Sequence, residues 1–301
     1  MKVSAFTYVR NGLQLDYPFV ESIQSILPVV DEFIVVIGNS VDGTRKAIEA
    51  LNNSRIKIID TVWDDTIRSG GRIFALQANI GLDNVSKDAD WIFHLQADEV
   101  IHEKDLPVIK DAMQQFLNQS KVEGLLFDFI NFFGDYEHYA PSRRYHQKEI
   151  RIIRNNPHFR SYKDSQGFRS FINPENIWQE KGSKLSVKKI NAAVYHYSYV
   201  KDPKVQLKKH LVFGNRWQEN DEWMKEYLEQ NKNGFDYAKI DFLYAFKGTH
   251  PAVMQTKIKK QDWAFNYDSS KNDMNLKEKF LKLMQDVTGK QLFIYKNYKM
   301  I

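Results

Sequence analysis

Hydrophobic and polar positions follow two alternating patterns over the first 130 residues of the chain. Short continuous apolar runs, typical of strands buried on both faces, occur at Lys2–Val9, Phe33–Ile37, Arg55–Ile59 and Trp91–Leu95. Apolar residues at helical spacing lie between and after these runs. The first such helix is expected to have Asp16 as its cap and Pro18 in its first turn. Strand and helix therefore alternate with short links, which predicts an α/β fold with a mostly parallel sheet flanked by helices.

The pattern changes after residue 130. Asn131–Arg144 is rich in aromatic residues and turn formers and resembles a lid or an acceptor loop. Glu149–Arg154 and Ala192–Val200 are expected to extend the sheet, and helical patterns dominate the rest of the chain. No flexible linker separates these parts. We therefore expect residues 1–200 to form one α/β domain and residues 201–301 to form a helical C-terminal extension packed on it.

Polar turns follow two of the expected strands. Gly38–Thr44 comes after one strand, and Gln96–Glu99 comes after another. Ligands of open α/β sheets bind beyond the carboxyl ends of the strands, so these two turns are expected at one rim of a shared site. A carboxylate at such a strand end, here Asp98 or Glu99, can ligate Mg²⁺ or Mn²⁺ while a diphosphate fills other coordination positions. Either turn alone could also be an ordinary solvated loop.

Several classes of protein are excluded by missing motifs. No Gly-x-Gly-x-x-Gly follows the first strand and no Gly-x-x-x-x-Gly-Lys-Ser/Thr is present, which argues against a dinucleotide dehydrogenase and a P-loop enzyme. The absence of cysteine removes disulfides, thiolate zinc sites and cysteine nucleophiles, and fits a cytoplasmic location. No apolar run approaches the length of about 18 residues that a membrane span needs.

Charge is distributed unevenly along the chain. The net charge of +5 combines −7 over residues 1–150 with +12 over residues 151–301. The basic second half could attract a diphosphate, an anionic glycan or an anionic membrane surface, so peripheral contact with the inner face of a membrane is one expectation. A solvated basic face is the plain alternative. Nucleic acid is not an expected partner, because the lysines are scattered and no nucleic-acid-binding module is present.

Four segments together resemble the successive motifs of glycosyltransferase family 2 in both order and spacing. They are Ser4–Asn11, Val36–Thr44, Ala75–Gly81 and Trp91–Glu99. The resemblance covers roughly the first 130 residues and implies a GT-A-like (Rossmann-like) fold. It further implies an inverting glycosyltransferase that uses a divalent metal, Mn²⁺ or Mg²⁺. The donor would be a nucleotide-diphosphate sugar, and the acceptor a glycan or a lipid-linked molecule.

The resemblance also implies roles for particular residues. Asp98 and His196 would hold the metal, and Asp164 would be the base that activates the acceptor hydroxyl, with Glu149 and Asp128 as rivals. The nucleotide would be bound by Thr7, Tyr8, Asn39, Arg72 and Gln96. Arg72 could grip the diphosphate together with the amides at the start of its helix, or it could be a solvated first-turn residue.

Two departures from the family pattern bear on the function. The family usually has Asp-x-Asp-Glu where this chain has Gln96–Glu99, so a neutral amide replaces one carboxylate. Ile37 and Gly38 stand where acidic residues commonly precede the second motif. These departures motivate a different hypothesis, a non-catalytic nucleotide- or sugar-binding protein with a degenerate site. A nucleotidyltransferase is a further alternative, although Thr7–Asn11 lacks the glycine-rich loop of that class.

Overall fold

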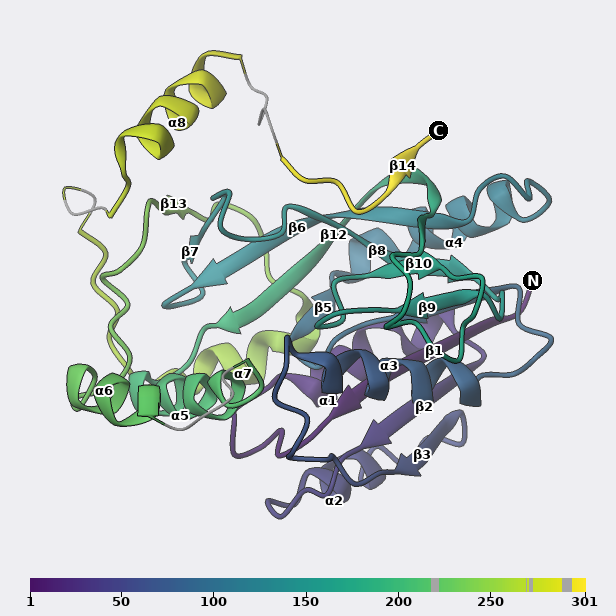
Figure 1. Ribbon diagram of the computed structural model, residues 1–301, viewed down its shortest axis with the longest axis horizontal. Helices are drawn as coiled ribbons and strands as arrows, with labels where there is room; N and C mark the ends of the chain where they lie inside the picture. Colours follow the sequence, from purple (N-terminus) through teal and green to yellow (C-terminus); the bar gives the residue numbers. More distant parts are fainter. Residues whose placement is uncertain (218–221, 269, 271–272, 289–293) are drawn as a thin grey trace.

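The computed structural model describes residues 1–217, 222–268, 270, 273–288 and 294–301. One large mixed sheet runs through the molecule (Figure 1). Its first half is parallel and has the order β4-β1-β2-β3. These strands are β1 (Val3–Val9), β2 (Glu32–Ile37), β3 (Ile56–Asp60) and β4 (Trp91–His94). The α/β sheet flanked by helices that the alternating pattern predicts is confirmed.

The second half of the sheet mixes parallel and antiparallel pairs. From β4 the order continues through β8 (Lys148–Arg154), β6 (Gly124–Phe133), β7 (His138–Tyr139) and β13 (Tyr244–Ala245). The long strand β12 (Ser186–Tyr199) lies parallel to β6 and also pairs with β5 (Glu99–Ile101) and β14 (Lys299–Met300). Because β8 is antiparallel to both β4 and β6, the strands β1, β4, β6 and β12 all end at the same edge of the sheet.

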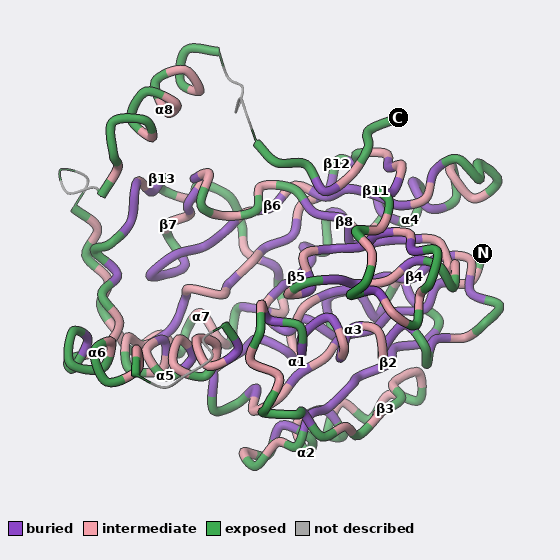
Figure 2. Tube along the Cα trace, viewed as in Figure 1, coloured by how far each residue is buried: buried purple, intermediate pink, exposed green. Residues whose placement is uncertain are grey.

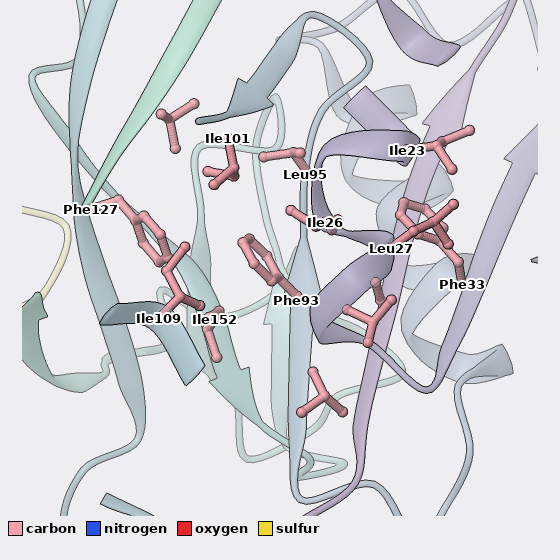
Figure 3. Close-up of a cluster of buried hydrophobic side chains, with 14 of the residues drawn as sticks. Ile23, Ile26, Leu27, Phe33, Phe93, Leu95, Ile101, Ile109, Phe127 and Ile152 are labelled. Atoms are coloured by element: carbon pink, nitrogen blue, oxygen red, sulfur yellow. The ribbon is translucent and has the colours of Figure 1, made fainter. Parts of the chain in front are cut away.

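Helices cover the two faces of the parallel half. Helices α1 (Phe19–Ile26) and α4 (Leu106–Phe116) enclose one core with residues of β4, β6 and β8, and Figure 3 shows Phe93 and Phe127 filling it beside Ile26. Helix α3 (Arg72–Asn84) covers the other face, where Ala78 and Leu82 pack on β1 and β2. Helix α2 (Thr44–Glu49) links β2 to β3. The buried tube in Figure 2 follows β2 and β4, as burial on both faces requires, whereas β3 at the edge of the sheet is less buried.

A small antiparallel sheet lies next to α3. It consists of β9 (Phe159–Ser161), β10 (Phe168–Ser170) and β11 (Ser183–Lys184). Phe159 and Phe168 join the core under α3, so this sheet holds the turn between β9 and β10 close to the end of β1. That turn contains Asp164.

Two local expectations from the sequence are wrong. Asp16 does not cap the first helix: its backbone is left-handed, with φ of 49°, and Pro18 occupies the N-cap position without a side-chain cap bond. Asp16 instead forms an ion pair with Lys257. The segment expected as a loop from Asn131 begins as strand, because β6 continues to Phe133.

The chain after β12 carries most of the remaining helices. They are α5 (Pro203–Gly214), α6 (Glu222–Gln230), α7 (Gln255–Lys259) and α8 (Leu276–Thr288). In Figure 1, α5 and α6 lie at the opposite end of the molecule from the two termini. Short 3-10 turns occur at Leu27–Val29, Glu103–Asp105 and Ala252–Met254. Within the described ranges, no helix is long and apolar enough to cross a membrane.

Candidate active site

A cavity of about 710 Å³ opens at the edge where β1, β4 and β12 end. Its wall is assembled from segments that are distant in the sequence. The residues that line it include Tyr8, Arg10, Trp63, Gln96, Asp98, Asn131, Glu149, Asp164, His196, Phe213, Arg216 and Trp217. Five of the eight residues that the sequence nominates are therefore brought together: Tyr8, Gln96, Asp98, Asp164 and His196. The volume is in the range of sites that take a whole small-molecule ligand.

Asp98 lies in the short link between β4 and β5, and its carboxylate has two cationic or basic neighbours. Its Oδ1 is 3.7 Å from Nε2 of His196. On the other side, Nζ of Lys209 in α5 donates to Oδ2 at 3.4 Å. The backbone is fixed as well, since the amide of Tyr197 donates to the carbonyl of Asp98 at 2.9 Å. The carboxylate is thus held with one oxygen towards the lysine and the other towards the histidine.

The charge of Asp98 is set by these neighbours. Burial alone would raise its pKa, but the ammonium of Lys209 and the ring of His196 outweigh that effect and hold the pKa of Asp98 below its usual range. Lys209 is itself enclosed, because it also donates to the carbonyl and the hydroxyl of Ser198. It does not line the cavity, so its role is to fix and neutralise Asp98 from behind.

His196 is oriented by an amide on the neighbouring strand. Its Nδ1 is 2.8 Å from Oδ1 of Asn131, and the Nδ2 of Asn131 donates to the carbonyl of His146 at 2.8 Å. Because the amide oxygen of Asn131 only accepts hydrogen bonds, Nδ1 of His196 carries a proton. Nε2 is therefore the ring nitrogen that lies towards Asp98. When protonated it can stabilise the carboxylate, and when deprotonated it could share a cation with it.

Glu99, the second carboxylate of the acidic segment, already has partners within the protein. It forms a buried ion pair with Arg151 of β8, with a distance of 2.7 Å between Nε and Oε2. Oε2 also accepts from the backbone amide of Gln96 at 3.0 Å. A carboxylate with these partners is committed to shaping the turn, which leaves Asp98 as the carboxylate of this segment that is available to a ligand.

Asp164 stands in a strained turn that faces the cavity. Lys163 and Ser165, on either side of it, both have left-handed backbones, with φ of 55° and 67°. Such conformations are costly for residues other than glycine and are concentrated at functional sites. Across the gap, a Cβ on Gly71 would lie 2.7 Å from Cβ of Asp164, so only glycine lets the two loops approach this closely.

One carboxyl oxygen of Asp164 is able to accept a further hydrogen bond. Its Oδ1 is buried and has no hydrogen-bond partner among the residues that the structure describes. Burial raises the pKa of Asp164 above its usual value. A buried carboxyl oxygen without a partner, in the wall of a cavity, can accept a proton or a hydrogen bond from a ligand.

The two rivals of Asp164 occupy different environments. Asp128 is absent from the cavity wall and forms ion pairs with Lys148 and Lys189, at 3.6 and 2.7 Å. Glu149 does line the cavity, and burial raises its pKa to about 8. The structure therefore keeps Glu149 as a residue of the site and places Asp128 at the surface.

Three of the nominated nucleotide-binding residues lie outside the cavity wall. Thr7 is fully buried within β1. Asn39 is exposed, and its Oδ1 accepts from the backbone amide of Trp63 at 3.2 Å. Arg72 is exposed, and its guanidinium lies 5.0 Å from the ring of Trp178. Thr7 and Asn39 lie within family-like motifs and Arg72 lies close to one, but none of the three is among the residues that line the cavity.

Gln96 and Tyr8 complete the nominated part of the wall. The amide of Gln96 donates to the carbonyl of Ser165 at 3.4 Å, which ties the acidic segment to the Asp164 turn. The ring of Tyr8 stacks on His94, with 5.9 Å between ring centroids. Both residues therefore support the floor of the cavity between Asp98 and Asp164.

Sequence reasoning missed several residues of the site. Lys209, Asn131, Arg151 and Arg216 have no motif of their own and come from elements outside the family-like segments. Arg151 falls between apolar neighbours in β8, and strand alternation would place such a residue on the face opposite theirs, so its burial has no signal in the sequence. No local signal distinguishes Lys209 from the other lysines of its helix.

Comparisons with known proteins give likeness at the level of the fold. No protein-family model and no curated protein matches the chain. Among solved structures, TarS from S. aureus in complex with UDP has 14% identity and a TM-score of 0.39, over 70% of this chain and 64% of its own. That solved chain is residues 1–349 of TarS, and this chain spans 64% of it, less than two thirds.

Two further solved structures show the range of the likeness. Glucosyl-3-phosphoglycerate synthase from Mycobacterium tuberculosis, in complex with Mn²⁺, uridine diphosphate and phosphoglyceric acid, has 18% identity over 43% of each chain and a TM-score of 0.31. A 4-diphosphocytidyl-2C-methyl-D-erythritol synthase from Anaerococcus prevotii has 14% identity and a TM-score of 0.37, over 71% of this chain and 94% of its own. The likeness lies in the path of the chain and says nothing of what this protein binds.

Proposed function

We propose that this protein is a glycosyltransferase that moves a sugar from a nucleotide-diphosphate sugar to a hydroxyl of a glycan or a lipid-linked acceptor, with inversion. One observation supports this above all. Gln96, Asp98, Asp164 and His196, which the family-like motifs and the segments after them nominate separately, line one cavity at the carboxyl edge of the sheet. Ligands of open α/β sheets bind at that edge.

In this proposal Asp164 is the base. The acceptor hydroxyl gives its proton to the Asp164 carboxylate while its oxygen forms a bond to the anomeric carbon. The bond from that carbon to the diphosphate breaks, and its electron pair leaves with the diphosphate. The buried, unpartnered Oδ1 of Asp164 suits proton transfer, because its raised pKa lies closer to neutrality than that of a solvated aspartate.

The donor set around Asp98 fits a divalent cation only in part. Oδ1 of Asp98 and Nε2 of His196, 3.7 Å apart, offer one carboxylate oxygen and one imidazole nitrogen. No group of three or more His, Cys, Asp or Glu residues that could hold a metal occurs in the described part of the chain. Mn²⁺ or Mg²⁺ commonly takes one or two carboxylates together with substrate phosphates and water, which matches this set. A cation held there would neutralise charge on the departing diphosphate.

The test is turnover with matched variants. The protein is incubated with UDP-, GDP- and dTDP-sugars and a mixture of oligosaccharide acceptors, and release of the nucleoside diphosphate is measured. Asp164→Asn should lower the rate by about 10²-fold or more, in line with the loss of a general base. Asp128→Asn, which changes a paired surface carboxylate, should leave the rate unchanged. Equal rates for both variants and the wild type would refute the role of Asp164.

The neutral side chain of Gln96 favours a second candidate, a non-catalytic nucleotide- or sugar-binding protein. Its amide is bonded to the Asp164 turn, where a carboxylate would add negative charge for a metal. A thermal-shift series with nucleoside diphosphates, with and without Mn²⁺, separates the two candidates. A transferase should show stabilisation by the nucleotide that depends on the metal, and a sugar-binding protein should be stabilised by glycan alone.

A further inference from the structure

Glu149 is a buried carboxyl at the cavity that the proposed reaction does not use. It lies near the start of β8, and its side chain has only 7% of its surface exposed. Oε1 is 3.3 Å from Nδ1 of His146, itself a residue of the cavity wall. Oε2 is buried and has no hydrogen-bond partner within the described part of the molecule. Buried polar atoms in native proteins nearly always have a partner, so this oxygen calls for one.

The cation that acts most on Glu149, Arg151, is already paired. Arg151, two residues further along the same strand, uses its guanidinium on Glu99 through Nε at 2.7 Å and through Nη2. Burial raises the pKa of Glu149 and outweighs the opposing effect of Arg151, and the negative charge of Glu99 raises that pKa further. The surroundings of Glu149 thus favour its protonated, neutral form. A neutral carboxyl can both donate and accept a hydrogen bond.

The backbone of Gly167 packs closely against the free oxygen of Glu149. Gly167 has φ of 103°, and a Cβ built there would lie 2.8 Å from Oε2 of Glu149. Any other residue at this position would press against the carboxyl. Gly167 belongs to the same turn as Asp164, so the free oxygen of Glu149 and the proposed base are presented by adjoining parts of one wall.

We propose that Glu149 binds a hydroxyl group of a carbohydrate substrate, donating one hydrogen bond to it and leaving proton transfer to Asp164. This inference rests on the proposed function and deepens it by giving the site a residue that recognises the sugar. The hydroxyl could belong to the sugar of the donor or to the acceptor. The two sources share the same chemistry, and separate binding measurements distinguish them.

The substitutions separate recognition from base catalysis. Glu149→Gln keeps the size, the neutrality and a hydrogen-bond donor, whereas Glu149→Leu removes hydrogen bonding and keeps the volume approximately. If Glu149 recognises a hydroxyl, the Glu149→Gln variant should retain most of the sugar-dependent affinity and turnover, and the Glu149→Leu variant should show lower values of both. If Glu149 were the base, Glu149→Gln would abolish turnover with binding intact, as Asp164→Asn should. That second pattern would overturn the proposal.

The binding experiment uses the full chain and calorimetric titration with defined probes. UDP, GDP and dTDP are compared with UDP-glucose, GDP-mannose and dTDP-glucose, and an oligosaccharide mixture is titrated separately. In the donor arm, the nucleotide sugar should bind more tightly than the bare diphosphate. Glu149→Leu should reduce this difference in affinity by roughly three- to tenfold, which corresponds to the loss of one hydrogen bond. In the acceptor arm, the same loss would appear for the oligosaccharides instead. Glu149→Leu should leave the affinity for the bare diphosphate unchanged. This unchanged binding also shows that the variant is folded.

The outcomes distinguish this inference from the proposed function. If the wild type binds nucleotide sugars and oligosaccharides and Glu149→Leu changes the affinity for neither of them, Glu149 has no recognition role and the proposed function stands. If the wild type binds none of the six nucleotides, the proposed function fails and this inference fails with it. Asp128→Asn serves as the matched control in both arms, since Asp128 is a paired carboxylate outside the cavity.

Discussion

At the scale of single residues, Asp98 owes its properties to the side chains around it more than to its place after β4. Lys209 donates to one of its oxygens at 3.4 Å from behind the cavity wall, and His196 lies near the other. An acidic residue held in this way stays ionised at neutral pH without a metal or a substrate, which is the state that binding a cation or orienting a histidine requires.

A double-mutant cycle tests this pair. Asp98→Asn leaves the buried ammonium of Lys209 without a counter-charge, and Lys209→Met leaves the carboxylate with His196 alone. Each single variant should lose about 3 kcal/mol of the free energy of unfolding, because breaking one side of a buried ion pair leaves a desolvated charge. The double variant should lose less than the sum of the two. Urea denaturation measures all four proteins, with Lys208→Met as the exposed control on the same helix. Additive losses would show that the two charges do not interact.

Glu149 gives a prediction for the pH dependence of stability. Its pKa is about 8 in the folded protein and near the model-compound value of 4.5 in the unfolded chain. The folded state therefore binds more protons between these values, and its contribution to stability, complete below about pH 4.5, is lost as pH rises through 8. The loss should be on the order of 5 kcal/mol.

Glu149→Gln removes this titration. The free energy of unfolding of the wild type should therefore fall relative to that of the variant as pH rises from 5 to 9. Denaturant unfolding of both proteins at several pH values measures the difference, and all other titrating groups cancel in it. Curves that run parallel across this range would mean that Glu149 is ionised in the folded state at neutral pH.

The individual site residues show what sequence reasoning can reach. Asp98 and Gln96 were found because the polar turn Gln96–Glu99 follows a strand whose apolar run is easily seen, and Tyr8 came from the first family-like motif. Asp164 and His196 came from family-like order along the chain. Lys209 and Asn131 could not be found in this way, because their roles depend on which strand or helix packs beside Asp98 and His196. That packing is a long-range property of the fold.

At the scale of elements, the last residues of the chain hold the turn that carries Asp164. Asn297 is buried, and its Oδ1 accepts from the hydroxyl of Tyr162 and from Nε of Arg169 at 3.0 Å. Its Nδ2 donates to the carbonyl of Gln166 at 3.0 Å. The adjoining strand β14 pairs with the start of β12, so a segment more than 125 residues away in sequence braces both sides of the turn.

Asn297→Ala should loosen this turn. Losing three hydrogen bonds at a buried site should cost about 1–3 kcal/mol of the free energy of unfolding. If Asp164 is the base, turnover should fall further than the affinity for nucleoside diphosphate, since the nucleotide does not depend on the turn. Steady-state kinetics and denaturation measure both effects, and Lys296→Ala, an exposed neighbour, is the control. An unchanged rate in a destabilised variant would separate the turn from catalysis.

The elements of the first 120 residues could be predicted closely because the signals there are local. The strands Val3–Val9 and Trp91–His94 lie within a residue or two of the expected segments. The later strands were harder. β6 is apolar over nearly all of its length and was not placed, and β5 and the sheet β9–β11 are too short to give a period. Asp16 was misplaced because its left-handed backbone depends on the contacts that hold it, among them the ion pair with Lys257.

At the scale of the whole molecule, residues from both sides of the expected domain boundary at residue 200 contribute to the candidate site. Lys209 neutralises Asp98 from α5, and Phe213, Arg216 and Trp217 form part of the cavity wall. Phe213 also stacks on Phe74 of α3, with 4.9 Å between ring centroids. The division into a domain of residues 1–200 and a helical extension remains a prediction, and the contacts indicate that the first part alone would lack one wall of its site.

Two truncated chains test this prediction. A chain of residues 1–200 should unfold at a much lower temperature than the full chain, because it exposes Phe74 and leaves Asp98 without Lys209. A chain that ends at residue 268 keeps α5 and its contacts but loses α8, the ion pairs of Arg144 with Asp273 and Glu278, and the segment with Asn297. It should still bind nucleoside diphosphates while its turnover falls. Calorimetry and nucleotide titration measure both chains. A stable, nucleotide-binding fragment of residues 1–200 would show that the extension is an accessory, whereas the predicted order of losses would make α5 part of the site and the C-terminal strand its brace.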